Sequence, residues 1–257
     1  MFYKYKLIDI LKYAVFLILI VLTVIFLSQR IGYNWQFYRI KEFLYNYENG
    51  RLVFGPLIKG LGITLKISSV SLVLAILLGF FTAILRMTES FSGNFIARGY
   101  ILIIRNTPLI IQLFFVYFVI APPFGINAFY SGVIALSLFE GAYISEIIRG
   151  SILSVGKEQF ESSMSLGMNF YQRMRYIILP QALRLAAPPL ASQMIALVKD
   201  SALVSTISIY DMTMQAQRLV SETYLVFEIW FTVAGIYLLI NLMLSMLVKF
   251  VNMKVYE

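Results

Sequence analysis

The apolar positions of this chain fall into long runs. About 20 consecutive apolar residues are needed for a helix to cross the hydrocarbon core of a bilayer. Six stretches reach or approach this length, and they are Leu11–Leu27, Ile67–Leu85, Thr107–Ala121, Tyr130–Ile148, Leu190–Ile209 and Ile229–Phe250. The third is short, and we expect it to extend back through Ile101–Ile104. The pattern predicts an all-α membrane protein with about six transmembrane helices.

The first run resembles the apolar part of a signal peptide, because Lys4, Lys6 and Lys12 precede it. It ends at Phe26–Arg30 without the small-x-small pattern of a cleavage site. We therefore expect a retained anchor. Lys and Arg in the intervening segments then favour a cytoplasmic N-terminus, with thirteen on the inner side against six on the outer side. Both termini are predicted to be cytoplasmic.

The segment after the first run, Tyr33–Tyr47, is rich in aromatic residues, and Ile40, Phe43, Leu44 and Tyr47 share one helical face. Such a segment is typical of a helix lying in the outer membrane interface, although a plain connecting loop fits equally well. We expect two parts of the chain. Residues 1–55 form the anchor with its external segment, and residues 56–257 form the main transmembrane domain.

The composition excludes several classes of protein and of functional site. Apolar residues make up 60% of the 257 residues and charged residues 13%, which excludes a soluble domain and a disordered chain. There is no Cys and no His, so thiol nucleophiles, thiolate metal sites and His-based catalytic triads are excluded. The net charge of +8 is explained by loop Lys and Arg, and we expect no nucleic-acid partner.

One inner segment, from Arg149 to Pro189, is much longer than a connection requires. Its pattern predicts a short helix over Val155–Leu166 that ends at Gly167 in a left-handed conformation. Asn169, with Gln172 three residues later, is typical of a capping box that begins a second helix, which Pro180 limits. Two short helices with an apolar ridge are thus predicted to project from the membrane.

These residues carry a family resemblance. Glu161-Ser162-Ser163, Gly167 and Ile177-Ile178-Leu179-Pro180 resemble, in order and spacing, the EAA loop of ATP-binding-cassette (ABC) importer permeases, and the rest of the chain resembles their polar amino-acid branch. The further motifs are Gly60–Leu65, Arg105–Pro108 with Gln112, Glu140–Tyr143, Glu146–Gly150, Pro180–Ala182 and Leu197–Ser201. The departures are small: Ser162 and Ser163 replace the two alanines, Asn106 replaces Gly, and Phe139 replaces Asn.

The resemblance implies a type I ABC importer permease fold, with a methionine-importer-permease-like core of five helices plus an N-terminal helix. It implies a multi-pass protein of the prokaryotic plasma membrane. The implied partners are two ABC ATPase subunits, a second permease copy or paralogue, and an extracytoplasmic amino-acid-binding protein. The chain lacks the Gly-x-x-x-x-Gly-Lys-Ser/Thr phosphate loop, so ATP is expected in the partner ATPase, and no cofactor is expected in this chain.

The resemblance also implies roles for the projecting segment, about residues 151–182, which inserts into the ATPase. The expected coupling residues are Glu161, Ser162, Ser163, Gly167, Arg173, Arg175, Leu179 and Pro180. Glu161 is expected to anchor the segment, Gly167 to let its helices turn closely, and the two arginines to meet acidic residues. A solvated hairpin without a partner is the alternative.

Charged residues inside the spans point to the pathway. Lys199 and Asp200 lie near the middle of the fifth predicted span, where each costs about 2.5–3.5 kcal/mol. An amino-acid zwitterion needs a cation and an anion, and the candidate pathway residues are Lys199, Asp200, Ser201, Glu140, Gln112 and Arg105. A structural network across helices is the alternative, as is an Arg105 that extends to the interface.

Other positions are expected to shape this region. Glu146 and Arg149 are expected to pair and to hold the projecting segment on the fourth span. Pro108 and Pro188-Pro189 are expected to break helices near the cavity or to kink them.

Three hypotheses follow. The first is the permease subunit of an ATP-driven importer of a polar amino acid, which is not itself an enzyme. The second is an ion-coupled secondary transporter that acts without an ATPase, with Lys199 and Asp200 as its coupling site. The third is a membrane enzyme that uses Glu140 or Asp200. The projecting segment favours the first, because only that hypothesis explains it.

Overall fold

A computed structural model describes residues 12–19, 22–23, 26, 32–48, 50–88 and 90–256. The chain forms two compact units, Met1–Arg39 and Ile40–Glu257. Their boundary lies before the predicted one at residue 55. In the first unit, residues 12–19 are helical, and the short 3₁₀ helix η1 covers Phe37–Arg39. Lys4, Lys6 and much of the predicted first span lie outside the described residues.

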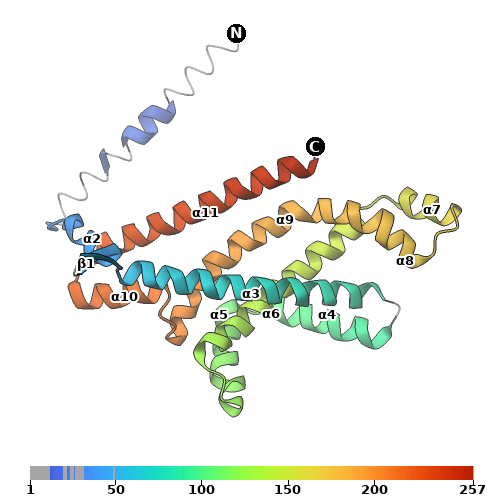
Figure 1. The fold of residues 1–257 in the computed structure, drawn as a ribbon, viewed down its shortest axis with the longest axis horizontal. Helices are drawn as coiled ribbons and strands as arrows, with labels where there is room; N and C mark the ends of the chain where they lie inside the picture. Colours follow the sequence, from blue (N-terminus) through green and yellow to red (C-terminus); the bar gives the residue numbers. More distant parts are fainter. Residues whose placement is uncertain are drawn as a thin grey trace, which may run out of the picture. The chain divides into compact units, whose positions relative to one another are not determined.

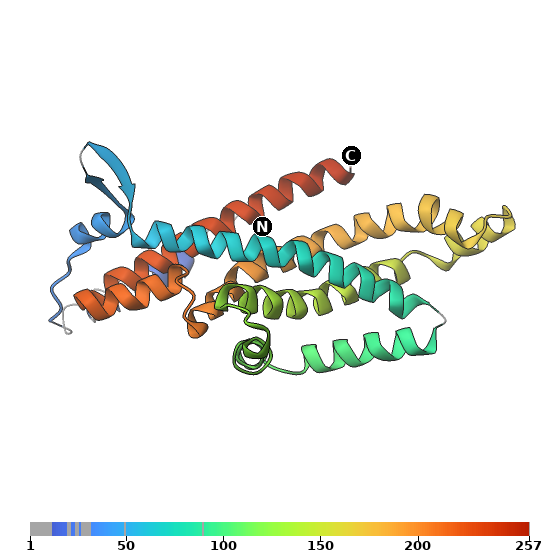
Figure 2. The same ribbon diagram turned by 60° about the horizontal axis from the view of Figure 1, so that its bottom comes forward.

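The second unit is almost entirely helical (Figures 1 and 2). Its elements are α2 (Ile40–Leu44), β1 (Tyr45–Glu48), β2 (Arg51–Phe54), α3 (Pro56–Met87), α4 (Phe91–Arg105), α5 (Leu109–Phe115), η2 (Val116–Ile120), η3 (Pro122–Phe124), α6 (Ala128–Leu153), α7 (Lys157–Ser165), α8 (Phe170–Arg173), η4 (Met174–Ile178), α9 (Leu179–Asp200), η5 (Ser201–Ile207), α10 (Met212–Thr223) and α11 (Val226–Tyr256). The sequence pattern predicted neither the antiparallel β1–β2 hairpin nor α10.

Among the described residues, four helical stretches are long and apolar enough to cross a membrane. They are Pro56–Met87, Ala128–Leu153, Phe170–Ile207 and Val226–Lys249, and they confirm four predicted spans while extending each of them. The predicted third span is wrong as a single straight helix. It consists of α4 and of α5 with η2, which meet at an angle of 110° and make a fifth span only if the bent pair is counted as one.

Pro108 and Gln112 produce this bend. Pro108 is the N-cap of α5 and has an extended conformation, and a proline also disfavours helical geometry at the residue before it, here Thr107. The Gln112 Nε2 donates to the carbonyl oxygens of Ile104 at 2.7 Å and of Thr107 at 3.0 Å. These bonds satisfy acceptors that the end of α4 leaves free. In Figure 2, α4 runs alongside α3, whereas α5 turns away.

The prediction that Pro180 limits the second helix is wrong, because the helix that contains Pro180 continues to Asp200. Of the two alternatives for Pro188 and Pro189, a break does not occur, since both lie inside α9. A π-helical turn, η4, directly precedes Pro180, and in it the Leu179 N–H donates to the Met174 carbonyl five residues earlier. Such a turn changes the register of the helical hydrogen bonds next to a residue that has no N–H. The projecting segment is therefore shorter than predicted, and its second helix belongs to a long span.

The centre of the second unit is the contact between α3 and α6, which is made by small residues. Ala75 and Ser71 on α3 are fully buried, and the Ser137 hydroxyl on α6 donates to the Ser71 carbonyl at 3.3 Å. A Cβ on Gly79 would lie 2.5 Å from Ile144 Cγ2, and a Cβ on Gly141 would lie 3.2 Å from Leu78 Cβ. Small residues allow such close approach, on which helix association in membranes depends.

An apolar cluster lies where α3 begins. Ile40 and Phe43 of α2 are buried against Leu57, Met212 and Leu225. The aromatic segment Tyr33–Tyr47, for which an interfacial helix and a connecting loop fitted equally well, is therefore helical over η1 and α2, and the apolar face of α2 packs within the protein. Tyr47 lies in β1 and is exposed.

We predict that Gly79→Ala lowers the stability of the protein, because the new methyl group overlaps Ile144. Overpacking of this kind costs about 1–3 kcal/mol. Gly62→Ala in the same helix is the control, since nothing lies within 4 Å of a Cβ there and alanine favours a helix. Thermal unfolding in detergent measures both. Equal effects of the two variants would contradict the close contact between α3 and α6.

Asp211 is the N-cap residue of α10, directly before its first residue, and is fully buried. Its Oδ1 accepts the Met214 N–H at 2.8 Å, and the adjacent Met212 N–H donates to Thr64 Oγ1 on α3 at 3.1 Å. Burial raises the pKa of Asp211 from 3.8 to about 6, although the hydrogen bond from Met214 opposes this shift. The folded chain therefore holds the proton more tightly than the unfolded chain does.

We predict that Asp211→Asn makes the protein more stable at pH 7 but not at pH 3. Well below the unfolded-state pKa of 3.8 the carboxyl group is neutral in both states, and the stability that it contributes is lost as the pH rises from there through the folded-state pKa of about 6. Asparagine keeps the capping oxygen and does not titrate. The gain at pH 7 should reach about 2–3 kcal/mol. A difference between variant and parent that does not change with pH would refute the prediction.

Candidate functional site

The projecting segment between α6 and α9 has the local structure that the sequence predicted. Its first helix, α7, is followed by Gly167 with φ of 72°, in the left-handed region. Asn169 and Gln172 then form a complete capping box: the Gln172 N–H donates to Asn169 Oδ1 at 2.9 Å, and the Asn169 N–H donates to Gln172 Oε1 at 3.0 Å. Nothing lies within 4 Å of a Cβ at Gly167, so this position requires glycine for its backbone conformation and not for close packing.

The coupling residues that the sequence suggested divide into an inner and an outer group. Ser163 is buried and its hydroxyl donates to the Phe160 carbonyl at 2.8 Å, and Leu179 is half-buried. Glu161 and Ser162 are exposed, as are Arg175 and Pro180, while Arg173 is half-buried. Within the described part of the chain, Glu161 makes no ion pair.

The periodicity of the two short helices places Met164 and Tyr171 on the predicted apolar ridge together with Phe160, Met174 and Ile177. The last three instead pack inward on the cluster of α3 and α6 that includes Ile152. The exposed apolar residues are Met164, Leu166, Phe170, Tyr171 and Tyr176. Leu166 is 78% exposed and Tyr171 72%. Burial alone decides which side faces outward, and the periodicity of these short helices did not show it.

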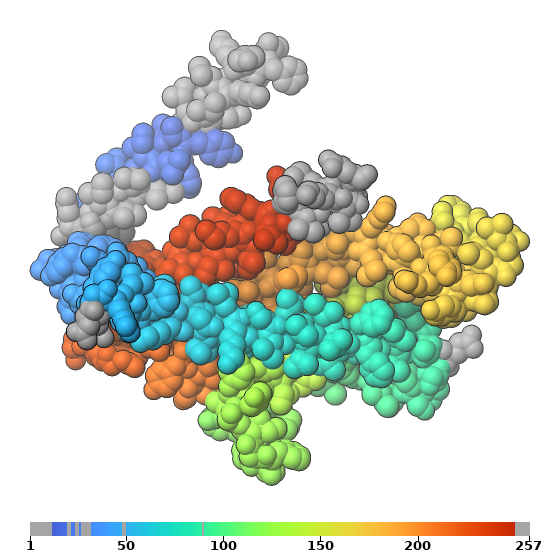
Figure 3. All heavy atoms as spheres, viewed as in Figure 1, coloured from blue at the N-terminus to red at the C-terminus, as the bar shows by residue number. Residues whose placement is uncertain are grey.

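A mostly apolar cavity of about 640 Å³ lies at the base of the segment. It is lined by Phe80, Ala83, Ile84, Met87 and Thr88 of the α3 end, by Ile148 and Ile152 of α6, and by Phe170, Met174 and Leu179. Side chains therefore leave an unfilled space where the projecting segment joins α3 and α6. Figure 3 shows α7 and α8 at one end of the second unit, far from α10 at the other.

Some candidate pathway residues come together between α6 and α9. Glu140 is fully buried on α6, and its Oε2 accepts the Gln193 Nε2 of α9 at 2.6 Å. Asp200 is half-buried and close enough for its charge to interact with Glu140. Ser201 is buried, and its hydroxyl donates to the Val198 carbonyl at 2.8 Å. Lys199 is exposed, and neither it nor Asp200 is in an ion pair among the described residues.

Gln193 lies in the same predicted span as Lys199 and Asp200 but is not among the candidate pathway residues. In the structure it is the residue that joins α9 to Glu140. The other two candidate pathway residues lie elsewhere. The Gln112 side chain is hydrogen-bonded at the bend between α4 and α5, and the Arg105 guanidinium lies 5.1 Å from the ring centre of Tyr143.

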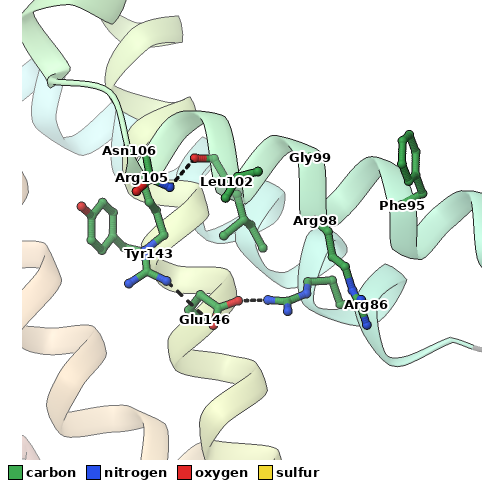
Figure 4. Close-up of a pocket in the computed structure, with 10 residues that line it drawn as sticks. Arg86, Phe95, Arg98, Gly99, Leu102, Arg105, Asn106, Tyr143 and Glu146 are labelled. Carbon is green, nitrogen blue, oxygen red and sulfur yellow. Dashed lines mark hydrogen bonds and ion pairs between the residues drawn. The ribbon is translucent and has the colours of Figure 1, made fainter.

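Glu146 joins three helices, as Figure 4 shows in part. Its carboxylate pairs with Arg86 of α3, lies 3.1 Å from Arg149 Nη2 and 3.9 Å from Arg105 Nη1 of α4. The predicted Glu146–Arg149 pair is thus confirmed, and the two further arginines are an addition of the tertiary structure. Beside it is a cavity of about 870 Å³. No group of three metal-ligating side chains exists among the described residues.

Comparison with known proteins identifies the family to which the chain is similar. Residues 75–256 match the family described as binding-protein-dependent transport system inner membrane component. The glutamine transport system permease protein GlnP of Escherichia coli K12 is 36% identical over 196 residues, which are 75% of this chain and 90% of that protein. The nopaline transport system permease protein NocM of Agrobacterium fabrum is 32% identical over 206 residues, or 76% and 86% of the two chains.

Solved structures agree. An amino acid ABC transporter crystallised with histidines is 38% identical, with a TM-score of 0.74 over 77% of this chain and 94% of that one. The inward-facing MetNI methionine ABC transporter, at 18% identity, shares the fold with a TM-score of 0.65 over 77% and 95%. The expected type I importer permease fold is therefore confirmed. This chain belongs to the family of binding-protein-dependent transport system inner membrane components.

Proposed function

We propose that this chain is the permease subunit of an ATP-driven importer and forms the pathway by which a polar amino acid crosses the prokaryotic plasma membrane. The observation that carries the proposal is the segment from α7 to η4. It is a capped, glycine-turned helix pair with an exposed apolar surface, and it joins α6 directly to α9. A partner that moves this segment therefore moves both spans that carry the Glu140–Gln193 contact.

The partner that this segment requires is an ATPase. Its surface combines the exposed aromatic residues Phe170, Tyr171 and Tyr176 with the charges of Glu161 and Arg175, a mixture typical of the centre and rim of an interface. The chain has no phosphate loop of its own, so ATP is hydrolysed in the partner, in two copies that match two permease subunits. Both termini and this segment lie on the cytoplasmic side.

The pathway lies beside the polar contacts between α6 and α9. Glu140 and Asp200 supply negative charge for a substrate ammonium group, and Lys199 supplies positive charge for a carboxylate. A buried carboxylate is costly, and its retention indicates a functional site. The Escherichia coli relative is named for glutamine transport and one solved relative was crystallised with histidines, which favours a polar amino acid as substrate. An extracytoplasmic binding protein delivers it, in accordance with the family description.

The test is uptake of a labelled amino-acid mixture into proteoliposomes that contain this chain with its co-expressed ATPase and binding protein. The vesicle lumen represents the cytoplasm, and ATP enclosed there should drive uptake. The labelled amino acid that the vesicles retain identifies the substrate. Uptake that ignores ATP and follows an ion gradient would overturn the proposal in favour of a secondary transporter.

We predict that Gly167→Val abolishes most ATP-dependent uptake, whereas Gly167→Asn retains it. Valine in the left-handed region costs about 1–2 kcal/mol or more, while asparagine tolerates this conformation. Both side chains have room, because nothing lies within 4 Å of a Cβ there. The two variants therefore differ in backbone strain and not in packing. Co-purification of the ATPase is measured in parallel, and equal uptake by both variants would show that the turn is not required for coupling.

We predict that Glu140→Gln leaves the protein folded but raises the KM for uptake at least tenfold, because the amide keeps an acceptor for Gln193 and removes the charge. Gln193→Leu instead leaves the buried carboxylate without its donor and lowers stability by about 3 kcal/mol. Uptake kinetics and thermal unfolding are measured for both. An unchanged KM for Glu140→Gln would exclude this carboxylate from the pathway and leave it a structural contact.

A further inference from the structure

The cavity beside Glu146 is surrounded by an excess of positive charge. We call Arg86, Arg98, Arg105 and Arg149 the arginine cluster; the first three line the cavity, and Arg149 pairs with the same carboxylate. They come from α3, α4 and α6, and their like charges lie close enough to act on Arg86. Glu146 neutralises one of the four, so a net charge of about three remains.

Glu146 does not use all of the guanidinium groups. It pairs with Arg86 and with Arg149 at 3.1 Å, but Arg105 lies at 3.9 Å, beyond hydrogen-bond distance. Arg98 has no ion pair in the part of the chain that the structure describes, and it extends from α4 toward Arg86 (Figure 4). Arg98 and Arg105 thus present free donors to one cavity, beside two arginines that are fixed on a carboxylate.

The cluster lies at the level of the lipid headgroups. Arg86 is the last residue but one of the 32-residue helix α3, and Arg149 lies near the end of α6. A helix of 32 residues is about 48 Å long, and the hydrocarbon core is about 30 Å thick. The end of α3 therefore reaches the interface, on the side where α7 projects.

Much of the rest of the cavity wall is apolar. Phe95 and Leu102 of α4 line it together with Ile101, and the first two are 70% and 66% exposed. A free inorganic anion would contact only the charged part of this wall. A ligand with an anionic head and hydrocarbon chains covers both parts of the wall at once.

We propose that the arginine cluster binds the phosphate group of an anionic phospholipid, with the acyl chains along Phe95 and Leu102 of α4. Arg98 and Arg105 contact the phosphate oxygens, because a guanidinium group matches a phosphate in a bidentate manner. Glu146 pairs with Arg86 and Arg149 and neutralises one positive charge of the cluster, so it competes with the phosphate for that charge. The lipid then joins α4 to the α3–α6 pair from outside, independently of which substrate is transported.

The test counts lipids that remain bound to the full chain, purified in detergent with phosphatidylglycerol or phosphatidylcholine, by native mass spectrometry. We expect the parent protein to retain phosphatidylglycerol, and Arg98→Gln to lower its affinity about tenfold, the usual effect of losing one charged hydrogen bond. Lys249→Gln, which removes an exposed cation of α11, is the matched control and should change nothing. Equal retention of the two lipids, or equal loss in both variants, would overturn the proposal.

Two further arms separate the source of the phosphate and the role of the carboxylate. Millimolar inorganic phosphate should not displace phosphatidylglycerol; full displacement would identify a site for free phosphate instead. Glu146→Gln should raise phosphatidylglycerol retention, because it removes the competing carboxylate. If Glu146→Gln lowers stability and does not raise retention in the protein that remains folded, the cluster is a structural network only, and the proposal fails.

Discussion

The close contact between α3 and α6 is the constraint on which the rest of the second unit depends. Lipid chains are as apolar as leucine, so two helices in a membrane gain little by burying large apolar residues against each other. Ser71, Ala75 and Gly79 let α3 approach Gly141 and Ser137 of α6 closely enough for backbone and hydroxyl groups to interact. Larger side chains at these positions would separate the two helices.

Helices α4 and α9 attach to this pair through polar contacts on α6. Tyr100 of α4 donates its hydroxyl to the Leu138 carbonyl at 2.5 Å, Gln193 of α9 donates to Glu140, and Arg86 and Arg105 meet Glu146. Glu140 thus contacts α9, whereas Glu146 contacts α3 and α4. Because α6 and α9 also carry the projecting segment, a displacement of that segment acts on the Glu140–Gln193 contact directly. This is a short mechanical connection between the proposed ATPase interface and the proposed pathway.

The prolines and the short capped helices show what local sequence can predict. Asn169, Gln172 and Gly167 behave as expected, because a capping box and a left-handed glycine depend on neighbours within four residues. Pro108 ends a helix as expected, since Gln112 satisfies the acceptors that the bend leaves free. Pro180 does not end its helix, and Pro188 and Pro189 do not break theirs, because packing along a 38-residue helical stretch outweighs a local cost of about 3 kcal/mol per proline.

The sequence by itself determined the membrane class, most of the spans, the capped segment and the family, because long apolar runs and residue spacings are properties of the chain alone. It also indicated which charged residues needed an explanation. Only the tertiary structure decided which of these charges meet: it joined Glu140 to Gln193, 53 positions apart, and gathered arginines from three helices around Glu146. Such contacts depend on the rotation and angle of whole helices. Those are set by the small-residue contact of α3 with α6 and by the 110° bend after α4, which no single window of the sequence contains.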